Sequence, residues 1–133
     1  MKTLLFAFIS SIIFLASCKK SASETEIPSG AYKGTFQRQT STGGAVSNVA
    51  LNFTGRGWGG ESSVNKYPAL CSGTYKKNSN ETINFESSCM WTADFDWTLI
   101  LSGQYNVALN GDSLNISKDF GNGTKDIYRL KKQ

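Results

Sequence analysis

Apolar and polar residues alternate with a period of two along most of the chain from residue 30 onward, whereas the spacing typical of helices hardly occurs. This alternation predicts β-strands, because successive side chains of a strand point to opposite faces of the sheet. Eight short segments show the pattern, and one parity of each is expected to face the core. In chain order the inward residues are Tyr32, Gly34 and Phe36; Val49, Leu51 and Phe53; Trp58 and Gly60; Gly73 and Tyr75; Ile83 and Phe85; Tyr105, Val107 and Leu109; Leu114 and Ile116; and Tyr128 and Leu130.

Turn signals between these segments predict how the strands pair. Asn110-Gly111 is typical of a two-residue type I′ turn, and Gly55-Arg56 suits a type II′ turn with glycine in the first central position. Shorter signals lie at Asn78–Asn80 and in the glycine-containing loop 119–125. These turns imply strand registers in which Phe53 lies opposite Trp58, Tyr75 opposite Phe85, Val107 opposite Leu114, and Ile116 opposite Tyr128. Inward residues thus meet inward residues, as a one-sided core requires.

Consecutive antiparallel strands joined by short turns predict an all-β domain, most simply a small up-and-down β-barrel of about eight strands. Closing the barrel removes the unpaired edges that an open sheet exposes to other chains. A β-sandwich is the alternative, because the number of strands alone does not decide closure.

The first residues match an export signal. Lys2 provides a positive charge, and the apolar run from Leu4 to Phe14 is too short to cross a bilayer core of roughly 30 Å as a helix. The following Leu15-Ala16-Ser17-Cys18 resembles the lipobox of bacterial lipoproteins. This resemblance implies cleavage before Cys18 and attachment of acyl chains such as palmitate, which would anchor the chain in a membrane. The alternative is an ordinary secretory signal followed by a chance cysteine.

Three regions follow: residues 1–17 as a lipoprotein signal peptide, residues 18–27 as the lipidated cysteine and a flexible tether, and residues 28–133 as one domain. Lys19 favours the outer membrane, on its periplasmic face or at the cell surface, since inner-membrane retention typically uses aspartate at this position. Removing Lys2 leaves 13 of the 14 basic side chains against 10 acidic ones, a net charge of about +3. The basic residues are scattered, so we expect no binding of nucleic acid.

Cys71 and Cys89 remain as a pair once Cys18 carries lipid. Export to an oxidising compartment favours a disulfide between them. The register that pairs Tyr75 with Phe85 also brings the two cysteines opposite each other, at a Cα separation of about 4.5–5.5 Å that a disulfide can bridge. The chain has no histidine and few cysteines, so we expect neither a metal site nor another cofactor.

Two motifs add a family resemblance. The segments Gly30–Phe36 and Asp126–Lys131 resemble the first and last strands of the lipocalin-like lipoproteins of Bacteroidetes, which are small calycin-like β-barrels. True lipocalins carry Gly-x-Trp on the first strand, and Tyr32 stands here in place of the tryptophan. The resemblance implies a barrel that binds a small apolar or amphipathic ligand.

One stretch, Cys89–Trp97, is unusually rich in aromatic and acidic residues. Its candidate ligand-binding residues are Trp91, Asp94, Phe95, Asp96 and Trp97. In one interpretation the rings form a lid that stacks on an apolar or sugar face, while the carboxylates accept hydrogen bonds from the ligand. In the alternative the rings plug one end of the barrel and the aspartates cap backbone N–H groups of the loop. A glycosidase pair or a calcium site built on the two aspartates finds no further support in the sequence.

The absence of histidine removes the usual general base and every Ser-His-Asp or Cys-His arrangement, so we expect no enzymatic activity. The leading hypothesis is therefore a membrane-anchored, non-enzymatic binder of a small apolar or amphipathic ligand. The alternative is a protein-interaction module, such as an inhibitor of a cell-wall hydrolase.

Overall fold

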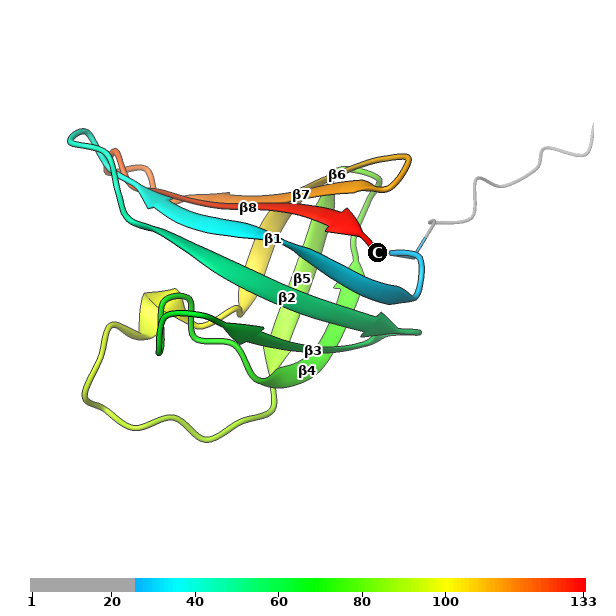
Figure 1. Cartoon of the computed structure of the whole chain (residues 1–133), viewed down its shortest axis with the longest axis horizontal. Helices are drawn as coiled ribbons and strands as arrows, with labels where there is room; N and C mark the ends of the chain where they lie inside the picture. The colour runs from blue at the N-terminus through cyan, green and yellow to red at the C-terminus, as the bar shows by residue number, and fades with distance from the viewer. Residues whose placement is uncertain (1–25) are drawn as a thin grey trace, which may run out of the picture.

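A computed structural model describes residues 26–133, and the predicted cleavage site and the predicted lipidation site, Cys18, lie outside these residues. The described chain forms eight antiparallel strands that close into one barrel (Figure 1). The strands are β1 (Gly30–Gln39), β2 (Val46–Thr54), β3 (Gly57–Ser62), β4 (Ser72–Lys77), β5 (Thr82–Ser87), β6 (Gly103–Asn110), β7 (Ser113–Asp119) and β8 (Lys125–Lys132). A single 3₁₀ turn, η1 (Trp97–Leu99), precedes β6. Within residues 26–133 no helix is long and apolar enough to cross a membrane.

The strand order confirms the up-and-down barrel and excludes the β-sandwich. Each strand pairs with its neighbours in sequence, and β1 pairs with β8 to complete the ring. That last pair places Gly34 opposite Leu130 and Phe36 opposite Tyr128, so inward residues meet across the closing seam as well. Every strand of the barrel therefore has a paired neighbour on both sides, and the sheet has no edge strand.

Three predicted registers are confirmed. Gly55 takes a positive φ of 55° in its turn, and Phe53 lies opposite Trp58. The other two confirmed pairs are Tyr75 with Phe85 and Ile116 with Tyr128.

The register predicted for β6 and β7 is wrong by two residues. Val107 lies opposite Ile116 rather than Leu114, because Asn110 still pairs with Ser113 and the turn is made by Gly111 and Asp112. Gly111 has a φ of 57°, whereas no left-handed conformation occurs at Asn110 or Asp112, which is the pattern of a type II′ turn. A shift of two residues preserves parity, so the same side chains still point inward.

Side chains fill the barrel interior. Its aromatic residues contact one another in a continuous series: Tyr32 with Phe53, Phe53 with Tyr75, Tyr75 with Phe85, Trp58 with Phe85, Phe85 with Tyr105, Tyr105 with Tyr128, and Tyr128 with Phe36. Burial raises the pKa of the Tyr105 and Tyr128 phenols, as expected for groups removed from water. Leu109 is the exception among the predicted core residues, because it lies beside the exposed β6–β7 turn and stays 37% exposed.

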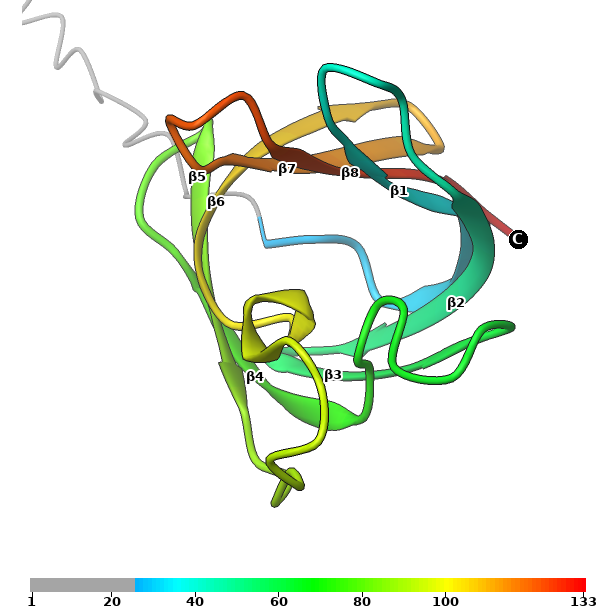
Figure 2. The same ribbon diagram turned by 90° about the vertical axis from the view of Figure 1, so that its left-hand side faces the viewer.

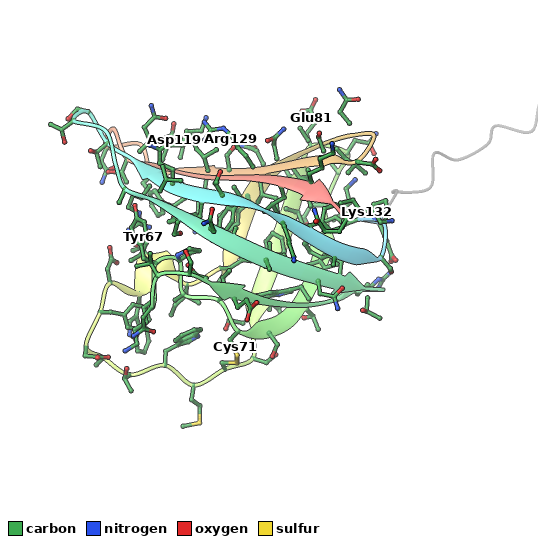
Figure 3. All side chains as sticks on the ribbon, in the orientation of Figure 1. Tyr67, Cys71, Glu81, Asp119, Arg129 and Lys132 are labelled. Carbon is green, nitrogen blue, oxygen red and sulfur yellow. A yellow bond between two sulfur atoms is a disulfide. The ribbon has the colours of Figure 1, made fainter. Side chains whose placement is uncertain are left out.

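The two ends of the barrel differ. Tight turns at 55–56, 78–81 and 111–112 form the turn end, while the connections 40–45, 63–71, 88–102 and 120–124 form the loop end. In Figure 3, Glu81 and Lys132 mark the turn end, and Tyr67 and Asp119 mark the loop end.

Chain segments close both ends. Residues 26–29 cross the turn end (Figure 2), and Ile27, which the sequence analysis assigned to the tether, belongs to the core instead. An apolar side chain at this position shields the strand aromatics from water, and the Tyr32 hydroxyl donates to the carbonyl of the next residue, Pro28, at 2.9 Å. At the loop end, Leu101 is buried and Tyr67 and Leu99 pack on the core.

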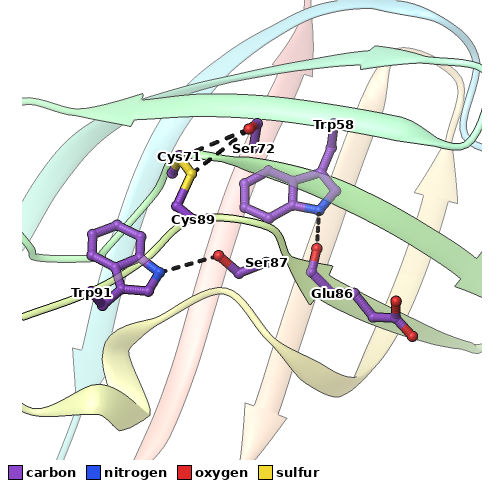
Figure 4. Close-up of a disulfide and its surroundings, with 7 residues drawn as sticks. All are labelled: Trp58, Cys71, Ser72, Glu86, Ser87, Cys89 and Trp91. Atoms are coloured by element: carbon purple, nitrogen blue, oxygen red, sulfur yellow. Dashed lines mark hydrogen bonds between the residues drawn. A yellow bond between two sulfur atoms is a disulfide. The ribbon is translucent and has the colours of Figure 1, made fainter.

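The predicted disulfide joins Cys71 and Cys89, whose Cα atoms are 6.4 Å apart (Figure 4). Both cysteines lie just outside the paired residues of β4 and β5, which explains a separation wider than that of directly opposed residues. The bond fixes the point where the chain leaves β5 for the loop end.

Replacing Cys71 by serine is expected to lower the free energy of unfolding by about 3 kcal/mol, because the disulfide closes a loop of about 19 residues in the unfolded chain. Urea denaturation of the variant and the unmodified protein measures this difference. Under reducing conditions the two proteins should become equally stable, and a difference that persists there would assign the effect to something other than the disulfide.

Candidate functional site

The loop that follows Cys89 carries the candidate residues, and it lies outside the barrel wall (Figure 1). None of Trp91, Phe95 and Trp97 belongs to the core, so the interpretation of these rings as a barrel plug is wrong. The interior is already filled by strand aromatics, and Tyr67, Leu99 and Leu101 occupy the loop end in their place. Trp97 is 55% exposed, and Met90 beside the disulfide is 100% exposed.

Trp91 is half-buried on the side of the barrel. Its indole N–H donates to the Ser87 hydroxyl at 3.2 Å (Figure 4), and its ring centroid lies 5.7 Å from that of Phe95. The ring borders a depression of about 230 Å³ whose other walls include Val64, Pro68 and Leu70. A partly exposed ring beside a depression is the geometry that a ligand-contacting loop requires.

Lys66 braces this loop from the β3–β4 connection. Its ammonium group donates to both carboxylate oxygens of Asp94, at 2.8 and 3.0 Å, and to the Thr92 hydroxyl at 3.0 Å. It also lies 4.9 Å from the centroid of the Phe95 ring, a cation–π contact. Lys66 itself has a φ of 57°, an uncommon backbone conformation for a residue other than glycine. Sequence analysis missed Lys66, because it lies far along the chain from Asp94 and no local pattern marks it.

The hydrogen bond from Lys66 lowers the pKa of the Asp94 carboxyl to about 2, and the Thr92 hydroxyl acts in the same direction. A lowered pKa in the folded state means that the ionised carboxylate stabilises the loop above the unfolded pKa of about 3.9. That contribution is lost as the pH falls from about 4 to about 2.

We expect the side-chain carboxyl of Asp94 to titrate near pH 2 in an NMR experiment that follows its carbon resonance. Lys66→Met should raise the midpoint toward about 3.9, because the charged donor is gone. Lys33→Met, on the distant outer face of β1, serves as the control and should leave the midpoint unchanged. A midpoint near pH 4 in the unmodified protein would contradict the hydrogen-bonded ion pair between Lys66 and Asp94.

Asp96 contacts a different part of the loop end from Asp94. Its carboxylate accepts hydrogen bonds from the backbone N–H and hydroxyl of Thr98, at 2.9 and 2.6 Å, and so caps η1. It also forms an ion pair with Arg38 at 2.8 Å. The contacts to Thr98 lower the pKa of Asp96 most strongly, and the nearby Arg38 charge adds to this effect.

The two carboxylates are therefore committed to separate structural partners. A glycosidase pair needs one carboxylic acid of raised pKa to protonate the leaving group, whereas both pKa values are lowered here. The geometry instead supplies a braced loop that displays apolar side chains. Comparison with protein-family models, with curated proteins and with solved structures finds no match to this chain.

Proposed function

We propose that this protein is a membrane-anchored, non-enzymatic lipoprotein that binds another protein of the cell envelope through its loop end. The packed interior carries this proposal, because a barrel filled by its own aromatic side chains favours recognition on the outer surface. An inhibitor of a cell-wall hydrolase is one protein of this class.

The loop end displays the side chains that such recognition uses. Met90 and Trp97 are exposed on the 88–102 connection, and Val64 is exposed on the neighbouring 63–71 connection. Methionine and tryptophan are enriched in the cores of protein interfaces, and tryptophan is frequent among the residues that dominate binding energy. The disulfide and the Lys66–Asp94 brace hold this surface in place before binding, which reduces the entropy lost on association.

The end of the barrel at which the described chain begins agrees with this use of the loop end. Glu26, the first described residue, forms an ion pair with Arg56 in the turn 55–56 and so lies at the turn end, from which a tether from Cys18 would approach the barrel. The loop end would then face away from the membrane, toward proteins in the aqueous part of the envelope.

Lipidation itself has a direct test. Cys18→Ala is expected to release the protein from membrane fractions into the soluble fraction, because acyl chains could no longer attach. Immunoblotting of the separated fractions measures the change, with Cys71→Ala as the control that keeps Cys18. Unchanged membrane association of Cys18→Ala would contradict the anchor.

Partner binding is tested by photocrosslinking in the host cell. A photoreactive phenylalanine analogue in place of Met90 should yield a discrete adduct with one envelope protein, whereas the same analogue in place of Asn80 at the turn end should not. Trp97→Ala should weaken the adduct while costing only about 1 kcal/mol of stability, because its ring is largely exposed. Adducts at both positions, or at neither, would contradict a loop-end interface.

A second candidate is the binding of a small amphipathic ligand, favoured by the depression beside Trp91. Its walls combine apolar side chains with the polar side chains of Glu61, Ser62 and Asn65, which suits a molecule with an apolar body and a polar head. Native mass spectrometry of protein purified from its host should then detect a copurifying molecule that Trp91→Ala loses. Protein without added mass would exclude this candidate.

A further inference from the structure

A separate depression of about 360 Å³ lies at the loop end, where the end of β1, η1 and the β7–β8 connection meet. These segments are far apart in sequence and come together only because β1 and β8 close the barrel. Its walls differ in chemistry from the exposed apolar surface formed by Met90, Trp97 and Val64. Guanidinium, carboxylate, hydroxyl and amide groups here surround one aromatic ring. Its walls include Arg38, Asp96, Thr98, Phe120, Asn122 and Thr124.

The depression is not built for an anion. Arg38 is its only cationic wall residue, and the five N–H donors of its guanidinium are all engaged. Asp126 receives two of these hydrogen bonds, at 2.7 and 2.8 Å; the Thr98 carbonyl and hydroxyl and the Asp96 carboxylate receive the other three. Lys118, which is not a wall residue, balances the second aspartate; its ammonium group lies 5.4 Å from the centroid of the Phe120 ring and donates to the Ser102 carbonyl at 3.3 Å. A phosphate or carboxylate ligand would therefore find no free cationic donor on the walls and would face the exposed Asp96 carboxylate.

The groups that remain available suit hydroxyls. Among the described residues, no acceptor takes a hydrogen bond from the side-chain amide nitrogen of Asn122, whose oxygen accepts from the Thr124 backbone N–H at 3.0 Å. The Thr124 hydroxyl likewise has no hydrogen-bond partner within residues 26–133, and the exposed Asp96 carboxylate keeps spare acceptor capacity. A donor amide, a hydroxyl and an acceptor carboxylate can satisfy neighbouring hydroxyl groups, each of which both donates and accepts. Phe120 adds an apolar wall for the C–H groups of such a ligand.

We propose that this depression is a binding site for a neutral, polyhydroxylated ligand, namely an uncharged saccharide unit. The bidentate Arg38–Asp126 pair fixes the guanidinium before binding, and the guanidinium in turn holds Asp96 and Thr98 in place. This proposal does not depend on the protein interface proposed above, since it uses other side chains.

The test is an NMR titration of the isotopically labelled full-length chain in a phosphocholine detergent, because sugar-based detergents would compete for the site. Cellobiose and N-acetylglucosamine are the neutral probes, and glucuronate and glucose 6-phosphate are the anionic probes. We expect at least one neutral probe to shift the backbone amide signals of Asp96, Asn122 and Thr124, and the anionic probes to bind at least about tenfold more weakly.

Asn122→Ala removes the free amide and should weaken the binding of the neutral probe about tenfold, with a folded spectrum retained. Asn80→Ala, in an exposed turn at the opposite end of the barrel, is the matched control and should bind as the unmodified protein does. Three results would each overturn the proposal: no shift of these amides by either neutral probe up to about 50 mM, equal or tighter binding of the anionic probes, or unchanged binding by Asn122→Ala. None of them bears on crosslinking at Met90, so the two proposals fail separately.

Discussion

Replacing Phe85 by alanine is expected to lower the free energy of unfolding by about 3–5 kcal/mol. The Phe85 ring is buried and lies within 6.1 Å, between centroids, of the rings of Trp58, Tyr75 and Tyr105. These rings belong to different strands of a closed barrel, so they cannot all collapse into the space that the substitution leaves. The loss would be a large share of the roughly 5–15 kcal/mol that stabilises a typical domain.

Urea denaturation measures this effect as a lower midpoint at an unchanged dependence on denaturant. Val46→Ala is the control, because Val46 is an apolar strand residue whose side chain is exposed, and its replacement should change stability by less than about 0.5 kcal/mol. Equal effects of the two substitutions would show that the interior is not packed as described.

Asp126→Ala is expected to cost a similar amount, about 3–5 kcal/mol, for an electrostatic reason. The Asp126 side chain is 1% exposed and that of Arg38 14% exposed, and the carboxylate accepts two hydrogen bonds from the guanidinium. Removing the carboxylate leaves a mostly buried cation without its principal partner. Substituting Arg38→Met together with Asp126→Leu should recover much of the loss, because no buried charge then lacks a partner and the Asp96 carboxylate that loses Arg38 is exposed to water.

Thermal or urea denaturation of the single and double variants tests this coupling. Glu26→Ala is the control, since it breaks the exposed Arg56–Glu26 pair and should cost at most about 1 kcal/mol. A double variant less stable than Asp126→Ala alone would contradict the explanation through an unpaired charge.

The sequence by itself determined the strands, their inward faces and most of the pairing. Alternation identifies the face of each strand, and glycine at a turn restricts where a hairpin can bend, as at Gly55. The disulfide followed from the same parity argument, because Cys71 and Cys89 continue the register of Tyr75 and Phe85. The β6–β7 register escaped this argument, since a shift of two residues keeps every side chain on its face and only the backbone of Gly111 distinguishes the two alternatives.

Only the tertiary structure decided closure, the position of the aromatic loop and the partners of its charges. The pairing of β1 with β8 joins the two ends of the domain, and no local signal in either strand requires it. The hydrophobicity of Trp91 and Trp97 predicts that their rings pack against other side chains. Whether they enter the core depends on the space that the strand aromatics leave. Lys66 and Arg38 meet the two loop aspartates across long stretches of chain, and such ion pairs exist only after the barrel has brought the connections to one end. Periodicity describes one element at a time, whereas packing volume and long-range charge pairing are properties of all elements together.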